Sequence, residues 1–174
     1  MKKTKTAELA HISLCTALIC VCSWIQVPFA VPFTLQTFAV FFTVMTFGIK
    51  KGLTAVVVYT LLGIVGVPVF SGFQGGIGAL VGPTGGFILG FIPAAVIVGL
   101  CAHKFGLGTL ASTVYCTAAL GVCYTAGVLW YAFVYGAGDL KGAFYTCVLP
   151  FIIPDAVKIF LAVIVSKRIK KIIK

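Results

Sequence analysis

The sequence predicts an all-α integral membrane protein with six transmembrane helices and both termini in the cytoplasm. Hydrophobic residues make up 61% of the chain and charged residues only 9%, whereas an ordinary soluble domain carries about 25% charged residues. A helix needs about 20 apolar residues to cross a bilayer, so the 174 residues leave little beyond helices and short loops. We therefore expect a single transmembrane domain over residues 1–174.

Hydropathy divides the chain into six apolar runs, each of which predicts a helix. The first follows a basic start, but it is long and no small-residue cleavage site ends it, so we expect a retained helix and not a signal peptide. The second run is short and aromatic, and Lys50 and Lys51 separate it from the third. Pro150 and Pro154 lie in the first half of the sixth. The expected spans are Ala7–Val27, Leu35–Ile49, Leu53–Val67, Gly85–Ala102, Thr109–Tyr135 and Tyr145–Ser166.

The basic residues predict the orientation of these spans. Only Lys141 falls on one side and only Lys158 within a span, and the positive-inside rule places the other, basic side in the cytoplasm. This placement explains the net charge of +10 without a nucleic-acid partner, since no basic stretch is interleaved with aromatic residues in a polar context. The cytoplasmic set is Lys2, Lys3, Lys5, Lys50, Lys51, Lys104, Lys167, Arg168, Lys170, Lys171 and Lys174.

The nearly uncharged side carries two long loops rich in glycine and proline, "VPFAVPFTLQTF" (Val27–Phe38) and "GVPVFSGFQGGIGALVGPTGG" (Gly66–Gly86). Irregular backbone near membrane depth is tolerated only where protein or a water-filled cavity surrounds it. We therefore expect an outward-facing ligand cavity with these two loops as its roof.

Two charged residues lie inside the last apolar run. Asp155 and Lys158 share one face of a helix at spacing i and i+3, and an ionisable residue within the membrane costs roughly 2.5–3.5 kcal/mol by insertion scales. One interpretation is an ion pair that only neutralises itself. The other is that the pair faces the cavity and binds a polar ligand. Because proline suits the first turn of a helix, Pro154 predicts a helix start that places the pair at the cavity floor.

The two loops supply further candidate ligand residues. The segment "GGIGALVGPTGG" lacks the Lys-Ser/Thr of a phosphate-binding P-loop, so we interpret it as a ligand-lining loop. A plain connector is the alternative for "VPFTLQTF". The candidates are Ser71, Gln74, Thr84, Phe70, Phe73 and Phe87 on the glycine-rich loop, Thr34, Gln36 and Thr37 on the other, and Trp24 at the end of the first span.

The sequence contains no pattern typical of an enzyme. It has no Ser-His-Asp arrangement at a plausible depth, no paired carboxylates, and no His at ligand spacing from a Cys. The seven cysteines mostly lie in apolar runs and are interpreted as small hydrophobic residues. We expect no metal and no cofactor.

Four stretches together resemble the BioY family, the biotin-specific S components of energy-coupling factor (ECF) transporters. They are "VPFTLQTFAV", "YTLLGIVGVPVFSGFQGG", "GPTGGFILGF" and "PDAVKIFLA", and the resemblance is weakest over Gly106–Tyr145. It implies an S-component fold in the plasma membrane of a prokaryote and capture of biotin from outside. It also implies a transmembrane coupling subunit with two cytoplasmic ATPases, which would hydrolyse ATP because this chain has no nucleotide motif.

The resemblance also implies roles for individual residues. Asp155 would accept a ureido N–H of biotin, and Lys158 would donate to the ureido oxygen or the carboxylate. Gln74 or Ser71 would complete the polar contacts, while Trp24 and the phenylalanines cover the rings. The only arginine, Arg168, is expected in the cytoplasm. If relatives hold the carboxylate tail of biotin with an arginine in the cavity, this chain must use another donor. Small residues of the first helix would contact the coupling subunit: Ala10, Ser13 and Ala17.

Two other functions stay open on the sequence. A small ion-coupled secondary transporter would use Asp155 as its ion site, although such proteins often carry internal repeats and none is evident here. A membrane scaffold without transport activity would tolerate apolar residues at both Asp155 and Lys158.

Overall fold

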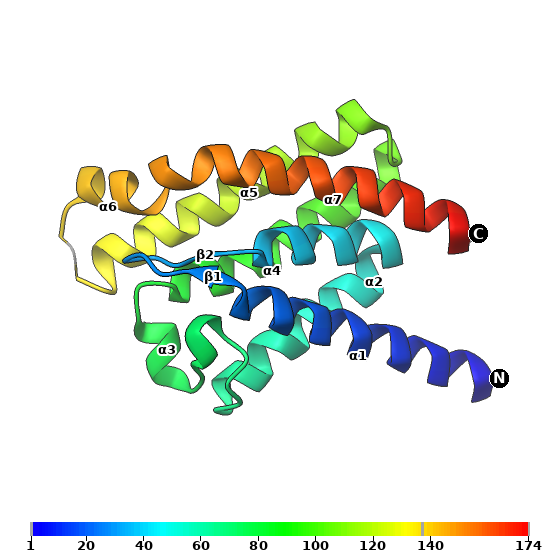
Figure 1. Cartoon of the computed structure of the whole chain (residues 1–174), viewed down its shortest axis with the longest axis horizontal. Coiled ribbons are helices and arrows are strands. Elements are labelled where there is room, and N and C mark those ends of the chain that lie inside the picture. Colours follow the sequence, from blue (N-terminus) through cyan, green and yellow to red (C-terminus); the bar gives the residue numbers. More distant parts are fainter. Residues whose placement is uncertain (1, 137, 174) are drawn as a thin grey trace.

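The apolar runs form long helices that pack side by side in a computed structural model, which describes residues 2–136 and 138–173 (Figure 1). Five helices of the described chain are long and apolar enough to cross a membrane. The long helices are α1 (Lys2–Trp24), α2 (Gln36–Ile64), α4 (Gly85–Phe105), α5 (Thr109–Phe133) and α7 (Ile152–Ile173). The short elements are β1 (Gln26–Val27), β2 (Phe33–Thr34), η1 (Ser71–Phe73), α3 (Ile77–Val81), α6 (Leu140–Cys147) and η2 (Leu149–Phe151).

Helix α2 is a hairpin of two arms. Gly48 has φ 84° and ψ 167°, a conformation that is open essentially to glycine alone. A Cβ on Gly52 would lie 2.6 Å from the Cα of Val44, although residues eight apart in a straight helix are about 12 Å apart. Figure 1 shows the helix turning back on itself. The arms correspond to the expected spans Leu35–Ile49 and Leu53–Val67, and the number of membrane crossings stays a prediction.

The last expected span, Tyr145–Ser166, is not one helix. The chain leaves α6 at Cys147, passes through η2 with Pro150 in it, and starts α7 at Ile152. Pro154 therefore lies in the first turn of α7 but does not begin it. Proline has no N–H to donate, which costs nothing in a first turn. Asp155 follows directly and also lies in this first turn.

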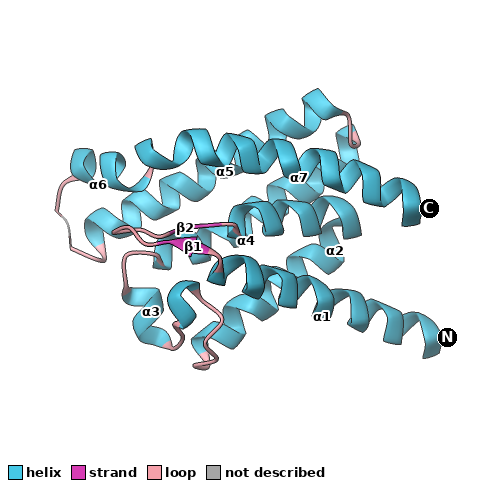
Figure 2. Ribbon diagram, in the orientation of Figure 1, coloured by secondary structure: helices cyan, strands magenta, loops and turns pink. Residues whose placement is uncertain are grey.

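One of the two expected roof loops contains a short ribbon. Strands β1 and β2 pair antiparallel, with Gln26 opposite Thr34 and Val27 opposite Phe33. The sequence did not predict these strands, which are magenta in Figure 2. Apart from them the regular structure of the described residues is helical, and the all-α prediction is confirmed.

Small residues allow α4 and α5 to pack closely. A Cβ on Gly90 would lie 3.2 Å from the Cα of Cys123, and one on Gly86 would lie 2.5 Å from the carbonyl oxygen of Ala126. Spacing of small residues by four permits this close approach of helices in membranes. Helix α7 contacts both α2 and α5, so its first turn lies among helices of the bundle.

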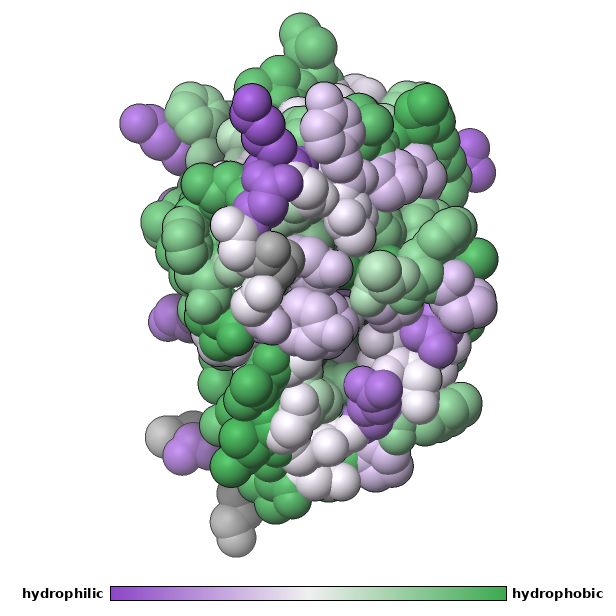
Figure 3. Space-filling model, turned by 90° about the vertical axis from the view of Figure 1, so that its left-hand side faces the viewer, coloured by the Kyte–Doolittle hydropathy of each residue, from purple (hydrophilic) through white to green (hydrophobic). Residues whose placement is uncertain are grey.

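The two ends of the bundle differ. Both termini lie at the same end, and the ribbon, α3 and α6 lie at the other (Figure 1). Figure 3 shows this second end, where pale and hydrophilic residues gather near the middle between green hydrophobic ones. The irregular loops are therefore concentrated at the end remote from the termini.

Candidate functional site

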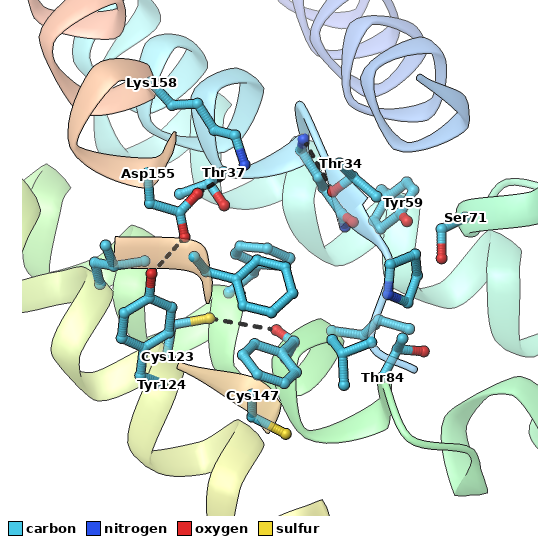
Figure 4. Close-up of a pocket in the computed structure, with 18 residues that line it drawn as sticks. Thr34, Thr37, Tyr59, Ser71, Thr84, Cys123, Tyr124, Cys147, Asp155 and Lys158 are labelled. Atoms are coloured by element: carbon cyan, nitrogen blue, oxygen red, sulfur yellow. Dashed lines mark hydrogen bonds and ion pairs between the residues drawn. The ribbon is translucent and has the colours of Figure 1, made fainter. Parts of the chain in front are cut away.

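A narrow cavity lies beneath the ribbon and the glycine-rich loop (Figure 4). Its volume is about 50 Å³, and one water needs roughly 10–15 Å³ measured in this way. The wall comes from the ribbon, both arms of α2, η1, α4, α5, α6, η2 and α7. The lining residues are Val31, Pro32, Thr34, Gln36, Thr37, Tyr59, Ser71, Thr84, Phe87, Ile88, Phe91, Leu120, Cys123, Tyr124, Cys147, Phe151, Asp155 and Lys158.

The Asp155 carboxylate is held by two donors, one on each oxygen. The Lys158 ammonium lies 2.7 Å from Oδ1, and the Tyr124 hydroxyl donates to Oδ2 over 2.6 Å. Figure 4 shows Tyr124 reaching the carboxylate from α5, while Asp155 and Lys158 come from α7. Asp155 and Lys158 are 3% and 4% exposed. A carboxylate has about four lone-pair sites, so Asp155 can accept further donors from the cavity.

The Lys158 ammonium also contacts the ribbon. It lies 3.7 Å from the centre of the Phe33 ring, and a cation over an aromatic face is attracted by the ring quadrupole. Phe33 in turn stacks on Phe151 with the ring centres 6.3 Å apart. The charge pair is therefore closed off on its outer side by an aromatic residue of β2.

Two other polar groups of the wall make no hydrogen bond of normal geometry within the described residues. These are Nε2 of Gln36 and the hydroxyl of Tyr59, in side chains that are 5% and 1% exposed. A buried polar atom without a hydrogen bond costs about 1–3 kcal/mol and calls for an explanation. Figure 4 shows Tyr59 with Thr34 and Ser71, away from Asp155. A ligand with a polar group at each end would satisfy both parts of the wall.

Comparison with known proteins identifies the family of this chain. The sequence model of the BioY family matches residues 1–174. The chain belongs to the BioY family. It is 42% identical over 168 residues to the biotin transporter BioY of Thermotoga maritima, covering 95% of this chain and 96% of that one. It is 40% identical over 169 residues to the probable biotin transporter BioY of Pyrococcus horikoshii, covering 95% and 98%.

The fold also matches a solved structure. The crystal structure of the S-component for biotin from an ECF-type ABC transporter superposes with a TM-score of 0.90, covering 98% of this chain and 94% of that one at 22% identity. The match confirms the S-component-like fold expected from the sequence. The family and the several apolar helices together indicate that the chain is a multi-pass membrane protein.

Eight of the residues expected to bind the ligand line the cavity, and four do not. Phe70 is buried in the core, with its ring 5.5 Å from that of Tyr59. Trp24 and Phe73 stack on each other with ring centres 5.1 Å apart, and Phe73 is 64% exposed. Gln74 is exposed. The eight on the wall are Asp155, Lys158, Ser71, Thr84, Phe87, Thr34, Gln36 and Thr37.

Sequence reasoning did not select several wall residues. Tyr124 and Tyr59 carried a signal, because a hydroxyl within an apolar run needs a partner when buried. The apolar members carried none, since hydropathy does not tell whether an apolar side chain faces the cavity, the core or lipid. The unselected residues are Val31, Pro32, Tyr59, Ile88, Phe91, Leu120, Cys123, Tyr124, Cys147 and Phe151.

The small residues expected to meet a coupling subunit lie on the outside of the bundle. Ala10, Ser13 and Ala17 are all exposed on α1, where Leu9 and Leu14 beside them are 64% and 65% exposed. Another helix could therefore approach this face of α1 closely.

No group of three or more metal-ligating side chains occurs in the part of the chain that the structure describes. Its cysteines are free thiols, and most are buried in the core.

Proposed function

We propose that this chain is the biotin-binding subunit of an ATP-driven ECF importer and that it captures biotin at the end of the bundle remote from the termini. The observation that carries the proposal is the buried Asp155–Lys158 pair, fixed by Tyr124 on the wall of a cavity. Relatives named as biotin transporters cover nearly the whole chain and support the same ligand.

The charge of Asp155 decides which end of biotin it meets. Biotin carries two ureido N–H donors at its bicyclic end and a carboxylate on its tail. An ionised Asp155 can accept hydrogen bonds but cannot donate one. Two carboxylates in contact also repel each other in a buried site. We therefore place the ureido ring at Asp155, with its oxygen accepting from Lys158, and cover the rings with Phe87, Phe91 and Phe151 of the wall.

The carboxylate tail of biotin is then placed at the two remaining polar groups of the wall. Nε2 of Gln36 and the hydroxyl of Tyr59 are two buried N–H and O–H groups without partners in the described structure, and a carboxylate accepts both. Arg168 is exposed on α7, about three helical turns beyond Lys158 and away from the cavity, and takes no part. Gln36 and Tyr59 thus replace a cavity arginine as the tail-binding groups.

Biotin enters only when the cavity widens. The present volume of about 50 Å³ holds about four waters, which is less than a bicyclic ring system needs. The two strands of the ribbon and η1 are the wall elements that contain no buried residue, and they carry Thr34 and Ser71, with Pro32 in the turn of the ribbon. We infer that these segments move outward to admit the ligand, and that Phe33 leaves Lys158 as they do.

Import itself requires partners. The chain carries no nucleotide-binding motif, so a transmembrane coupling subunit and two cytoplasmic ATPases would drive release. The exposed Ala10, Ser13 and Ala17 on α1 provide a face on which a coupling helix packs closely. The excess of basic residues at the end with both termini favours a cytoplasmic position for that end.

Uptake into vesicles tests the proposal. Proteoliposomes with this chain, coupling subunit and ATPases should accumulate labelled biotin when ATP is enclosed with the ATPases, and vesicles with the chain alone should not. Uptake by the chain alone under a proton or sodium gradient would contradict the proposal and favour the ion-coupled carrier. An ion-coupled carrier would need the Asp155 carboxylate to bind and release an ion. Both of its oxygens are already paired with Lys158 and Tyr124, which gives the ion-coupled carrier no support.

A further inference from the structure

A second cavity lies at the end of the bundle that carries the termini, far from Asp155. It is formed where α1, the turn of α2, the last turns of α4 and the end of α7 meet, and its volume is about 870 Å³. None of its residues lines the first cavity. They are Glu8, Ile12, Val44, Met45, Phe47, Gly48, Ile49, Lys50, Lys51, Thr54, Gly99, Leu100, Ala102, His103 and Lys170.

The charge of this cavity is positive. Lys50 and Lys51 come from the turn of α2 and Lys170 from α7, whereas Glu8 is the one carboxylate on the wall. None of the three lysines forms a salt bridge within the described residues, whose ion pair is Lys158–Asp155. His103 adds a ring that can donate or accept. Three lysines from two elements line this one cavity with a single opposing carboxylate, a charge balance that suits an anion.

The remaining wall is apolar. Ile12, Val44, Met45 and Phe47 reach the cavity from α1 and α2. Leu100 of α4 lines it too and is 57% exposed, so the cavity continues onto the lipid-facing surface of the bundle. Inorganic phosphate is wholly polar and leaves the apolar walls without a matching group. A phospholipid satisfies both parts, because its headgroup is anionic and its acyl chains are apolar.

We propose that this cavity binds an anionic phospholipid, with the phosphate held by Lys50, Lys51 and Lys170 and an acyl chain along Ile12, Phe47 and Leu100. Basic pockets between transmembrane helices are a known mode of headgroup recognition. The lysines join the turn of α2 to the end of α7, so a bound phosphate links these elements at the same end as the termini. The proposal does not depend on the ligand of the first cavity.

Lipid binding to the full-length chain tests this. Native mass spectrometry in mild detergent would compare phosphatidylglycerol with phosphatidylcholine for the wild type and for Lys50→Gln/Lys51→Gln/Lys170→Gln. The matched control is Lys104→Gln/Lys167→Gln/Lys171→Gln, which removes the same charge from residues that do not line the cavity. We expect the wild type and the control to bind phosphatidylglycerol about tenfold more tightly than phosphatidylcholine, and the cavity variant to lose this preference.

Three results would overturn the proposal. Equal loss in the two triple variants would mean a diffuse attraction to basic residues, and equal binding of the two lipids by the wild type would mean no headgroup site. Displacement of the lipid by millimolar inorganic phosphate would assign the site to a soluble anion. Thermal unfolding of each variant in detergent checks the fold. If the triple variant does not fold, Lys51→Gln alone should lower the preference about threefold, and an unchanged preference would count against the site.

Discussion

Tyr124 and Asp155 lie on different helices and are joined by a hydrogen bond of 2.6 Å. The hydroxyl of Tyr124 donates to one carboxylate oxygen and the ammonium of Lys158 donates to the other. The carboxylate is therefore fixed in orientation before any ligand arrives, and binding need not spend free energy on ordering it. The site depends on α5 as well as on α7.

Replacing Tyr124 by phenylalanine should weaken biotin binding without removing it. A hydrogen bond to a charged group contributes about 1.5–3 kcal/mol, so we expect the dissociation constant to rise by about tenfold or more. Isothermal titration calorimetry of the purified chain would measure this. Tyr145→Phe is the control, because Tyr145 is 63% exposed on α6. Unchanged affinity in Tyr124→Phe would mean that the bond does not position Asp155.

The ion pair should affect stability and binding separately. Lys158→Met leaves Asp155 as a buried charge without its ammonium partner, which costs about 3–5 kcal/mol. The double variant Asp155→Leu/Lys158→Met removes both charges, so most of the stability should return while biotin binding stays lost. Thermal unfolding and biotin titration of the single and double variants measure both quantities. A double variant that still binds biotin would make the pair purely structural.

Tyr59 should show opposite effects on stability and binding. Its hydroxyl is buried without a partner in the described structure, so Tyr59→Phe should leave the free protein as stable or slightly more stable. If the hydroxyl receives the biotin tail, the same change weakens binding by about fivefold or more.

Thr46 offers a matched control for Tyr59. Its hydroxyl is also buried and unpartnered, but it does not line the cavity. Thr46→Val should change stability in the same direction and leave biotin affinity unaltered. If Tyr59→Phe and Thr46→Val changed biotin affinity equally, Tyr59 would not belong to the site. Replacing the carboxylate of biotin by an amide should reduce the effect of Tyr59→Phe on affinity.

The turn of α2 should depend on Gly48. Its φ of 84° and ψ of 167° lie in a region that costs another residue about 1–3 kcal/mol, so Gly48→Ala should lower the unfolding temperature. Gly121→Ala in α5 is the control, because a Cβ there meets nothing within 4 Å and alanine favours a helix by about 0.5–1 kcal/mol. Similar unfolding temperatures for the two variants would show that the turn is not needed for stability.

The fold was largely predictable because apolar runs and basic residues are strong local signals. Five of the six expected runs correspond to a helix or to one arm of α2, although four of them extend one to three residues beyond its end, and Lys50 and Lys51 mark the turn of α2. The break between α6 and α7 was missed, because hydropathy cannot distinguish a continuous span from two helices joined by an apolar turn. The ribbon was missed as well, since strands of two residues carry no periodicity.

The candidate site was predictable where a residue type was out of place. Asp155 and Lys158 were selected because a charge in an apolar run is costly, and both line the cavity. The aromatic residues were not predictable, because their direction depends on packing. Phe70 lies on the glycine-rich loop and Phe87 directly after it in α4. Yet Phe70 fills the core beside Tyr59, whereas Phe87 lines the cavity.

Equilibrium binding of biotin to the purified chain tests the central claim most directly. The wild type and Asp139→Asn should bind with the same high affinity, because Asp139 is an exposed cap of α6. Asp155→Asn should bind at least about 100-fold more weakly, as expected when one member of a buried charge pair is lost. No binding by folded wild-type protein, or equal binding by Asp155→Asn, would contradict the account.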